Sequence, residues 1–131
     1  MKLTVDHVDN LCFRVSAGQH ATNVDAAPED GGGGTAMSAP CLFAAAIGAC
    51  ILEFVVNSCR LRGVPVDQLS LAMTYEEVSG PRRIARLGTT LHLEPEPPRH
   101  VQRRLIGVAR HATLINTLAR PIDLDIRFEG T

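Results

Sequence analysis

The sequence predicts a single α+β domain over residues 1–131, in which an antiparallel sheet is wrapped on a long central helix. Three observations lead to this fold class. Residues 38–63 form one apolar stretch with helix signals at both ends. Segments in which apolar and polar residues alternate come before and after it, and a second, shorter helical pattern lies near the C-terminus. A chain of 131 residues is long enough to bury one core.

Composition and charge are typical of a soluble globular protein. The chain is 45% hydrophobic and 21% charged, and its formal net charge of −1 argues against general binding to nucleic acid or anionic lipid. The first residues lack the basic segment and apolar core of a secretion signal. We therefore expect a cytoplasmic protein with neither nucleic acid nor a membrane as its partner.

The N-terminal region predicts strands followed by a loop. Apolar residues alternate over 3–7 and over 11–15, and the turn-forming pair Asp9–Asn10 between them predicts a hairpin. A shorter extended piece covers 20–24. Residues 26–37 contain four consecutive glycines, which predict a loop, and they lack the Gly-Lys-Ser/Thr of a phosphate-binding loop.

The central helix is predicted over residues 39–62. Ser38 can cap its first turn, and Gly63 can end it in a left-handed conformation. Apolar side chains surround nearly all of its first half, so we expect this helix to be buried on all sides. Its unbroken apolar run, 39–52, is shorter than the roughly 18 to 20 residues that a bilayer requires. A membrane span is therefore not expected.

The part after this helix predicts two more strands, a helix and a final strand. Alternation over 69–75 and 87–93 predicts a hairpin. Residues 98–110 have helical spacing, with three arginines on a face that is most simply interpreted as solvated. The clearest alternation in the chain, over 122–128, predicts a last strand at the sheet.

The cysteines are the remaining reactive groups, since no Ser-His-Asp or paired-carboxylate arrangement follows from local spacing. Cys12, Cys41, Cys50 and Cys59 include no Cys-x-x-Cys pair, and no histidine stands at metal-ligand spacing from them. We expect free thiols, no metal and no cofactor. Nine residues of helix turn each helical cysteine about 180° from the next and separate them by about 13.5 Å, too far for a disulfide. On spacing alone, core packing is the simpler interpretation of these thiols.

Residues 18–25, 31–34 and above all 42–50 carry a resemblance to a known family. They resemble the OsmC/Ohr family of organic hydroperoxide resistance proteins, and the similarity continues through Gly63 and 116–118 to the final strand. The resemblance implies an OsmC/Ohr-like fold. It also implies a tight, intertwined homodimer with two long helices at its centre and active sites between subunits, which would explain a helix that is apolar all round.

The resemblance also implies a chemistry. Cys50 matches the family cysteine that attacks a hydroperoxide as a thiolate and becomes a sulfenic acid, which a second cysteine captures as a disulfide. A dithiol then reopens that disulfide. Phe43, Ile47 and Phe54 are candidates to line an apolar pocket beside the sulfur, with plain core packing as the alternative.

The chain departs from the family pattern at three places. The second family cysteine falls at Ala112, so the resolving thiol is missing. The family glutamate before the helix falls at Pro40 or Cys41, and its arginine partner has no match. A buried thiol without a nearby cation is a poor nucleophile. Arg14, or an arginine of 99–110, could substitute.

Two function hypotheses follow, with a soluble protein of an unrelated α+β family as a third possibility. The first is a thiol-dependent peroxidase of the oxidative stress response, in which Cys50 reduces an organic hydroperoxide. An external thiol reductant, or Cys12, Cys41 or Cys59 supplied across the dimer, would resolve it. The second is a non-catalytic dimer that binds a small apolar ligand or senses redox state.

Overall fold

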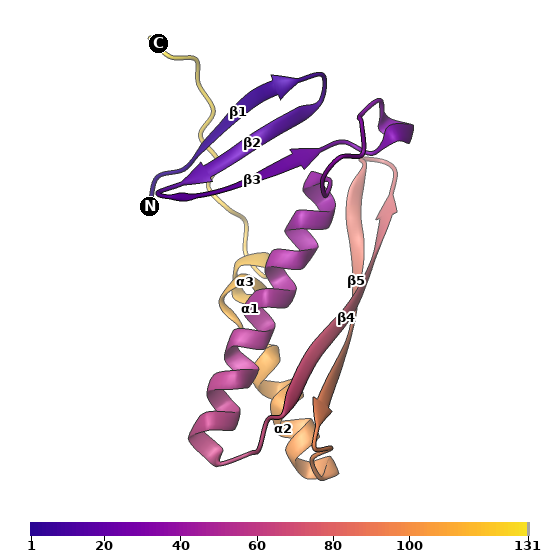
Figure 1. Cartoon of the computed structure of the whole chain (residues 1–131), viewed down its shortest axis with the longest axis vertical. Helices are drawn as coiled ribbons and strands as arrows, with labels where there is room; N and C mark the ends of the chain where they lie inside the picture. Colours follow the sequence, from indigo (N-terminus) through magenta and orange to yellow (C-terminus); the bar gives the residue numbers. More distant parts are fainter. Residues whose placement is uncertain (131) are drawn as a thin grey trace. The chain divides into compact units, whose positions relative to one another are not determined.

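The computed structural model describes residues 1–130 and confirms a mixed α+β architecture with antiparallel strands and one long helix (Figure 1). The backbone forms two compact units, one of residues 1–46 with 73–88 and one of residues 47–72 with the chain from Thr89 onward. In chain order the elements are β1 (Thr4–Asp9), β2 (Cys12–Ala17), β3 (His20–Asp25), the 3-10 helix η1 (Pro28–Asp30), α1 (Ala39–Arg62), β4 (Gln68–Val78), β5 (Arg83–Glu94), α2 (Arg99–Ala109) and α3 (Thr113–Leu118).

A three-stranded antiparallel sheet in the order β1-β2-β3 forms the start of the chain. His7 pairs with Phe13, and Phe13 with Val24, so the predicted hairpin and the third extended piece are both confirmed. Asn10 has a positive φ of 47° in the turn, which asparagine tolerates better than most residues. Its carbonyl oxygen lies 2.7 Å from Nε2 of His7. Residues close together in the sequence therefore determine this turn.

The glycine-rich loop after β3 is organised by one buried carboxylate. Asp25 accepts hydrogen bonds from the backbone N–H of Gly33 at 3.2 Å and from both the N–H and the hydroxyl of Thr35, at 3.0 and 2.6 Å. The Thr35 side chain, with these N–H groups, lowers the pKa of Asp25 below its ordinary value. At Gly32 a Cβ would overlap the carbonyl oxygen of Ala26. The loop therefore has a fixed path to the start of α1.

Helix α1 has the predicted bounds and ends. The hydroxyl of Ser38 accepts a hydrogen bond from the N–H of Cys41 at 3.3 Å, and Gly63 closes the helix with a φ of 68°. A stripe along the helix is buried, including Ile47 at 2% exposure and Val55 at 0%. Phe43, one turn before Ile47, is 46% exposed, however, and Ala45, Ala46 and Ala49 are exposed as well.

The prediction that α1 is buried on all sides is therefore wrong for the single chain. By length and apolar composition alone, the whole of α1 could cross a membrane. The sequence analysis did not expect a membrane span, because it considered only the unbroken apolar run over 39–52. Core helices of soluble proteins pass the same test, so this is weak evidence for a membrane span. These side chains are exposed because the single chain covers only part of the surface of this helix.

The hairpin after α1 is confirmed as the two-stranded sheet β4-β5. Along β4, half-buried Leu69, Leu71, Met73 and Tyr75 alternate with exposed residues, as the period of two predicts. The N–H of Asp67 donates to the carbonyl oxygen of Glu94 at 2.8 Å and joins the two ends of the hairpin.

The C-terminal region contains one confirmed helix and one that the sequence analysis did not predict. Helix α2 buries Leu105 and keeps its arginine face exposed, as predicted. Helix α3 is new; it begins after Ala112, whose side chain is fully buried. Six residues are too short for a helical period to be read from sequence.

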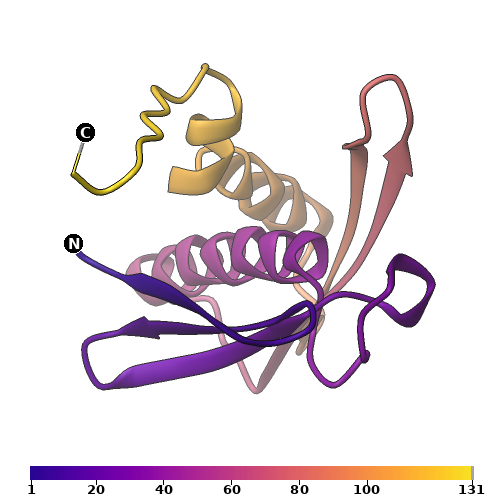
Figure 2. The same ribbon diagram turned by 90° about the horizontal axis from the view of Figure 1, so that it is seen from above.

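The predicted final strand over 122–128 is wrong for the chain as described. This segment leaves α3 without regular secondary structure (Figure 2). Ile122, Leu124 and Ile126 are 70%, 75% and 82% exposed. An alternating pattern becomes a strand only when a sheet edge accepts its hydrogen bonds and covers its apolar face, and no strand of the described chain does so here.

Candidate functional site

Cys50 lies in the middle of α1 at the border between buried and exposed residues. Its side chain is half-buried. One turn before it Ile47 is buried, and one turn after it Glu53 is exposed. Within residues 1–130, the side chain of Cys50 forms no hydrogen bond or ion pair. The thiol is therefore accessible in part and has no fixed cation in the single chain.

The three residues predicted to line a pocket fall on the same face of α1 as Cys50. Phe43, Ile47, Cys50 and Phe54 stand at i, i+4, i+7 and i+11, the spacing of one helix face. Phe43 is exposed, Ile47 is buried, and Cys50 and Phe54 are half-buried. The structure thus places the thiol in the centre of an apolar stripe, which we call the Cys50 stripe. Part of this stripe is open to a ligand or to another chain.

The other three cysteines differ in accessibility. All four are free thiols in the structure. Cys59 is fully buried, and this burial raises the pKa of its thiol, so it is suited to packing and poorly suited to thiol exchange. Cys41 in the first turn of α1 and Cys12 at the start of β2 are half-buried. They are the better candidates for a redox partner.

Ala112 occupies the place where the resemblance expects a second cysteine. Its side chain is 0% exposed, and it lies at the N-terminal end of α3, where its carbonyl oxygen accepts a hydrogen bond from Asn116. The position is part of the packed interior. The chain has filled it with a methyl group instead of a thiol.

A separate hollow of about 610 Å³ lies in the unit formed by residues 1–46 and 73–88. Its walls include Phe13, Tyr75 and the first turn of α1 up to Pro40. Arg82, also in its lining, donates to both carboxylate oxygens of Asp30, at 3.1 and 3.3 Å.

A second carboxylate also holds Arg82. Its Nε donates to Glu77 at 2.8 Å, and the two carboxylates raise the pKa of Arg82 above its ordinary value, Asp30 contributing more. The guanidinium is mostly exposed, so these ion pairs are screened by solvent. Arg82 was missed by the sequence analysis because Asp30 stands 52 residues away, a separation at which sequence carries no pairing signal. Arg14, the substitute considered there, is exposed on β2.

Among residues 1–130, no three His, Cys, Asp or Glu side chains gather as the ligands of a metal ion would.

Comparison with known proteins identifies the fold. The family model described as "OsmC-like protein" matches residues 31–127. No curated protein matches the chain. Among solved structures, a putative osmotic stress induced and detoxification response protein from Psychrobacter arcticus is similar with a TM-score of 0.84, at 18% identity, over 89% of this chain and 87% of that one.

Two further structures carry a description of activity. An organic hydroperoxide resistance protein, OsmC, from Legionella pneumophila is similar with a TM-score of 0.69 at 18% identity, over 89% of this chain and 87% of that one. A putative organic hydroperoxide resistance protein from Vibrio cholerae, with captopril bound in one of its active sites, has the same TM-score and identity over 90% and 84%. Likeness at this identity shows a shared fold, and the family model covers most of the sequence, so the chain belongs to the OsmC-like protein family.

Proposed function

We propose that this protein reduces organic hydroperoxides through Cys50. The observation that carries the proposal is the Cys50 stripe, in which a half-buried thiol stands between aromatic and aliphatic side chains on a partly open helix face. Such a face suits a substrate with an apolar body and one reactive oxygen pair. Two solved structures of the same fold are described as hydroperoxide resistance proteins, which supports the choice of substrate.

The proposed reaction is a two-electron oxidation of the sulfur. The Cys50 thiolate attacks one peroxide oxygen, an S–O bond forms, and the O–O bond breaks. The departing alkoxide takes up a proton and leaves as the alcohol, while Cys50 becomes a sulfenic acid. A thiol then attacks that sulfur and releases water, leaving a disulfide that a further thiol reduces.

The thiol that resolves the Cys50 sulfenic acid has to come from a position other than 112, where the family has its second cysteine. Alanine stands at 112, and Cys59 is fully buried. We therefore propose an external thiol reductant as the resolving group, with Cys41 or Cys12 of a second copy as the alternative. Helix geometry keeps Cys41 of the same chain too far from Cys50 for a disulfide, since nine helical residues span about 13.5 Å.

We further propose that the protein works as a homodimer. Phe43 on α1 is 46% exposed, and Ile122, Leu124 and Ile126 near the C-terminus are 70%, 75% and 82% exposed. Large apolar side chains that are open to solvent in this number are typical of a surface that a second copy covers.

A specific observation favours the second candidate, a dimer that binds an apolar ligand or senses redox state without turnover. The nearest charged residue along the helix face is Glu53, one turn after Cys50, and a carboxylate opposes a thiolate where a family arginine would favour it. A second chain that brings a cation to this face would offset the effect of Glu53 on the thiolate. The two candidate functions differ in one observable property, since only the peroxidase turns over a hydroperoxide.

A peroxidase assay separates them. The purified protein is supplied with an organic hydroperoxide and a dithiol, and peroxide consumption is followed over many turnovers. We expect turnover that is lost in Cys50→Ser and kept in Cys59→Ser, whose thiol is also on α1 but buried. Retention of turnover in Cys50→Ser would contradict the assignment, and a folded wild-type protein without turnover would favour the binding or sensing role.

A further inference from the structure

A stretch near the C-terminus contains no acidic residue. Residues 97–122 include five arginines and two histidines but neither aspartate nor glutamate. All 14 Asp and Glu residues, and eight of the 13 Lys and Arg residues, lie elsewhere in the chain. The formal net charge of −1 therefore averages a basic stretch with an acidic remainder. An expectation about partners that is drawn from the net charge alone does not account for this local distribution.

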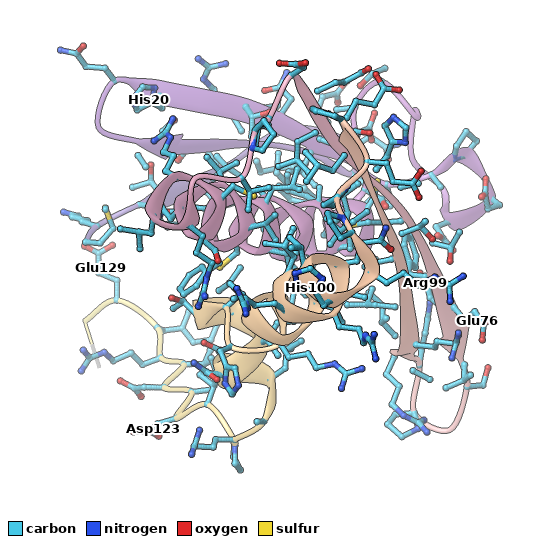
Figure 3. The ribbon with its side chains drawn as sticks, turned by 90° about the horizontal axis from the view of Figure 1, so that it is seen from below. His20, Glu76, Arg99, His100, Asp123 and Glu129 are labelled. Carbon is cyan, nitrogen blue, oxygen red and sulfur yellow. The ribbon has the colours of Figure 1, made fainter. Side chains whose placement is uncertain are left out.

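Helix α2 presents most of these charges on one exposed face. Its basic side chains are all exposed, and we call them the α2 basic face: Arg99, His100, Arg103, Arg104 and Arg110. At about 100° per residue, Arg99, Arg103 and Arg110 fall within about 40° of one another around the helix axis. Arg104 and His100 lie on the adjoining side. Figure 3 shows Arg99 and His100 at the start of α2, with their side chains directed away from the ribbon.

The cations of the α2 basic face have no anionic partner inside the protein. Within residues 1–130, none of its four arginines forms an ion pair or a side-chain hydrogen bond. Along the chain, the nearest acidic residues are Glu96 before α2 and Asp123 after α3. Like charges on neighbouring turns of a helix repel one another, and an anionic surface that covers them offsets this repulsion. The face is thus complementary to a negatively charged partner.

An apolar side chain stands in the middle of the α2 basic face. Ile106 is 47% exposed and lies between Arg103 and Arg110, beside Gly107, where an added Cβ would meet nothing within 4 Å. The opposite side of α2 is held in the protein, with Leu105 at 4% exposure. Cations around an exposed isoleucine match the outer part of a bilayer, where anionic headgroups lie above acyl chains. The phosphate backbone of a nucleic acid would match the arginines but offers little apolar surface to Ile106.

We propose that the α2 basic face docks on the surface of a bilayer that contains anionic lipid. The guanidinium groups donate hydrogen bonds to headgroup phosphates, and Ile106 is covered at the boundary with the acyl chains. Four arginines on one amphipathic helix reach the number that recognises anionic lipid, and each contributes about fivefold to the partition coefficient. The contact is peripheral, because the apolar side of α2 stays in the protein. It does not depend on the reaction proposed for Cys50.

Cosedimentation with vesicles tests the docking. The full chain is mixed at low salt with vesicles of phosphatidylcholine alone, and with vesicles that also contain phosphatidylglycerol. We expect binding only to the second kind, and loss of that binding near 1 M salt, where the Debye length is about 3 Å. Replacing two arginines of the face, Arg103→Gln with Arg110→Gln, should weaken binding about 30-fold, since each contributes about fivefold. The matched control, Arg83→Gln with Arg86→Gln at exposed positions of β5, should leave binding nearly unchanged.

A fluorescent reporter tests the orientation. The chain contains no tryptophan, so Ile106→Trp supplies one in the α2 basic face. Its emission should shift to shorter wavelength with anionic vesicles, because the ring moves from water to the apolar boundary. Val5→Trp, at a 58% exposed position of β1, should not shift.

Three results would overturn the proposal in variants that thermal unfolding shows to be folded. These are equal binding to both kinds of vesicle, equal loss of binding in the two arginine double variants, and a shift at position 5 with none at 106. Binding of a single-stranded oligonucleotide without binding to the anionic vesicles would also overturn it, and would assign the face to nucleic acid.

Discussion

Two residues one turn apart on α1 should respond very differently to truncation. Ile47 is 2% exposed and belongs to the buried stripe, whereas Phe43 is 46% exposed. Ile47→Ala removes three carbons from a packed site and should lower the free energy of unfolding by about 3 kcal/mol. For a chain of 131 residues this corresponds to a melting temperature lower by about 10 °C.

Phe43→Ala should act mainly on association. About half of a phenylalanine side chain, roughly 100 Å², is open in the single chain, and covering it is worth about 2.5 kcal/mol at 25 cal/mol per Å². A symmetric dimer covers two such rings, about 5 kcal/mol in all, so the variant should raise the dimer dissociation constant on the order of 10³–10⁴-fold. Sedimentation over a concentration series measures the constant, and thermal unfolding measures stability. A Phe43→Ala protein that dimerises as tightly as wild type would refute the argument that this side of α1 is an interface.

Three further predictions concern the carboxylate of Asp25, the glycines at 32 and 107, and the second thiol that the chain lacks at position 112. Because the pKa of Asp25 is lowered in the folded state, its contribution to stability is complete above its ordinary value of 3.8 and is lost as pH falls through the folded value. Asp25→Asn should therefore destabilise the protein at pH 7, and denaturant unfolding should show the difference from wild type shrinking below about pH 3.8. Gly32→Ala forces the loop backbone to move and should cost on the order of 1–3 kcal/mol by thermal unfolding, whereas Gly107→Ala, which has open space in α2, should stabilise by about 0.5–1 kcal/mol; equal effects would contradict this account. Ala112→Cys restores the second thiol, and peptide mapping after one equivalent of hydroperoxide should find a disulfide to Cys50; its absence in a folded variant would show that the two positions do not meet.

The elements that were predicted correctly are those whose signals are local. The hairpin β1-β2 follows from alternation around Asp9–Asn10, and the ends of α1 follow from Ser38 and Gly63. Each of these depends on residues within one turn or one strand of one another. Neighbouring residues decide such structure, so pattern and capping chemistry suffice to predict it.

The errors have a different physical origin. Burial of α1 on all sides and a strand over 122–128 both require a covering surface that the single chain does not supply. Arg82 and Asp30 pair across 52 residues, and no periodicity connects them. The placement of Cys50, Phe43 and Phe54 on one face, by contrast, follows from helix spacing alone. What that face contacts does not follow from helix spacing.

The central claim is that Cys50 is the peroxide-reactive thiol, and trapping its sulfenic acid tests it most directly. The reduced protein is treated briefly with one equivalent of an organic hydroperoxide in the presence of a sulfenic-acid trap, and the labelled peptides are identified by mass spectrometry beside the Cys50→Ser variant. The account predicts rapid labelling confined to Cys50 and none at buried Cys59. A folded, dimeric protein whose Cys50 remains unmodified would contradict it.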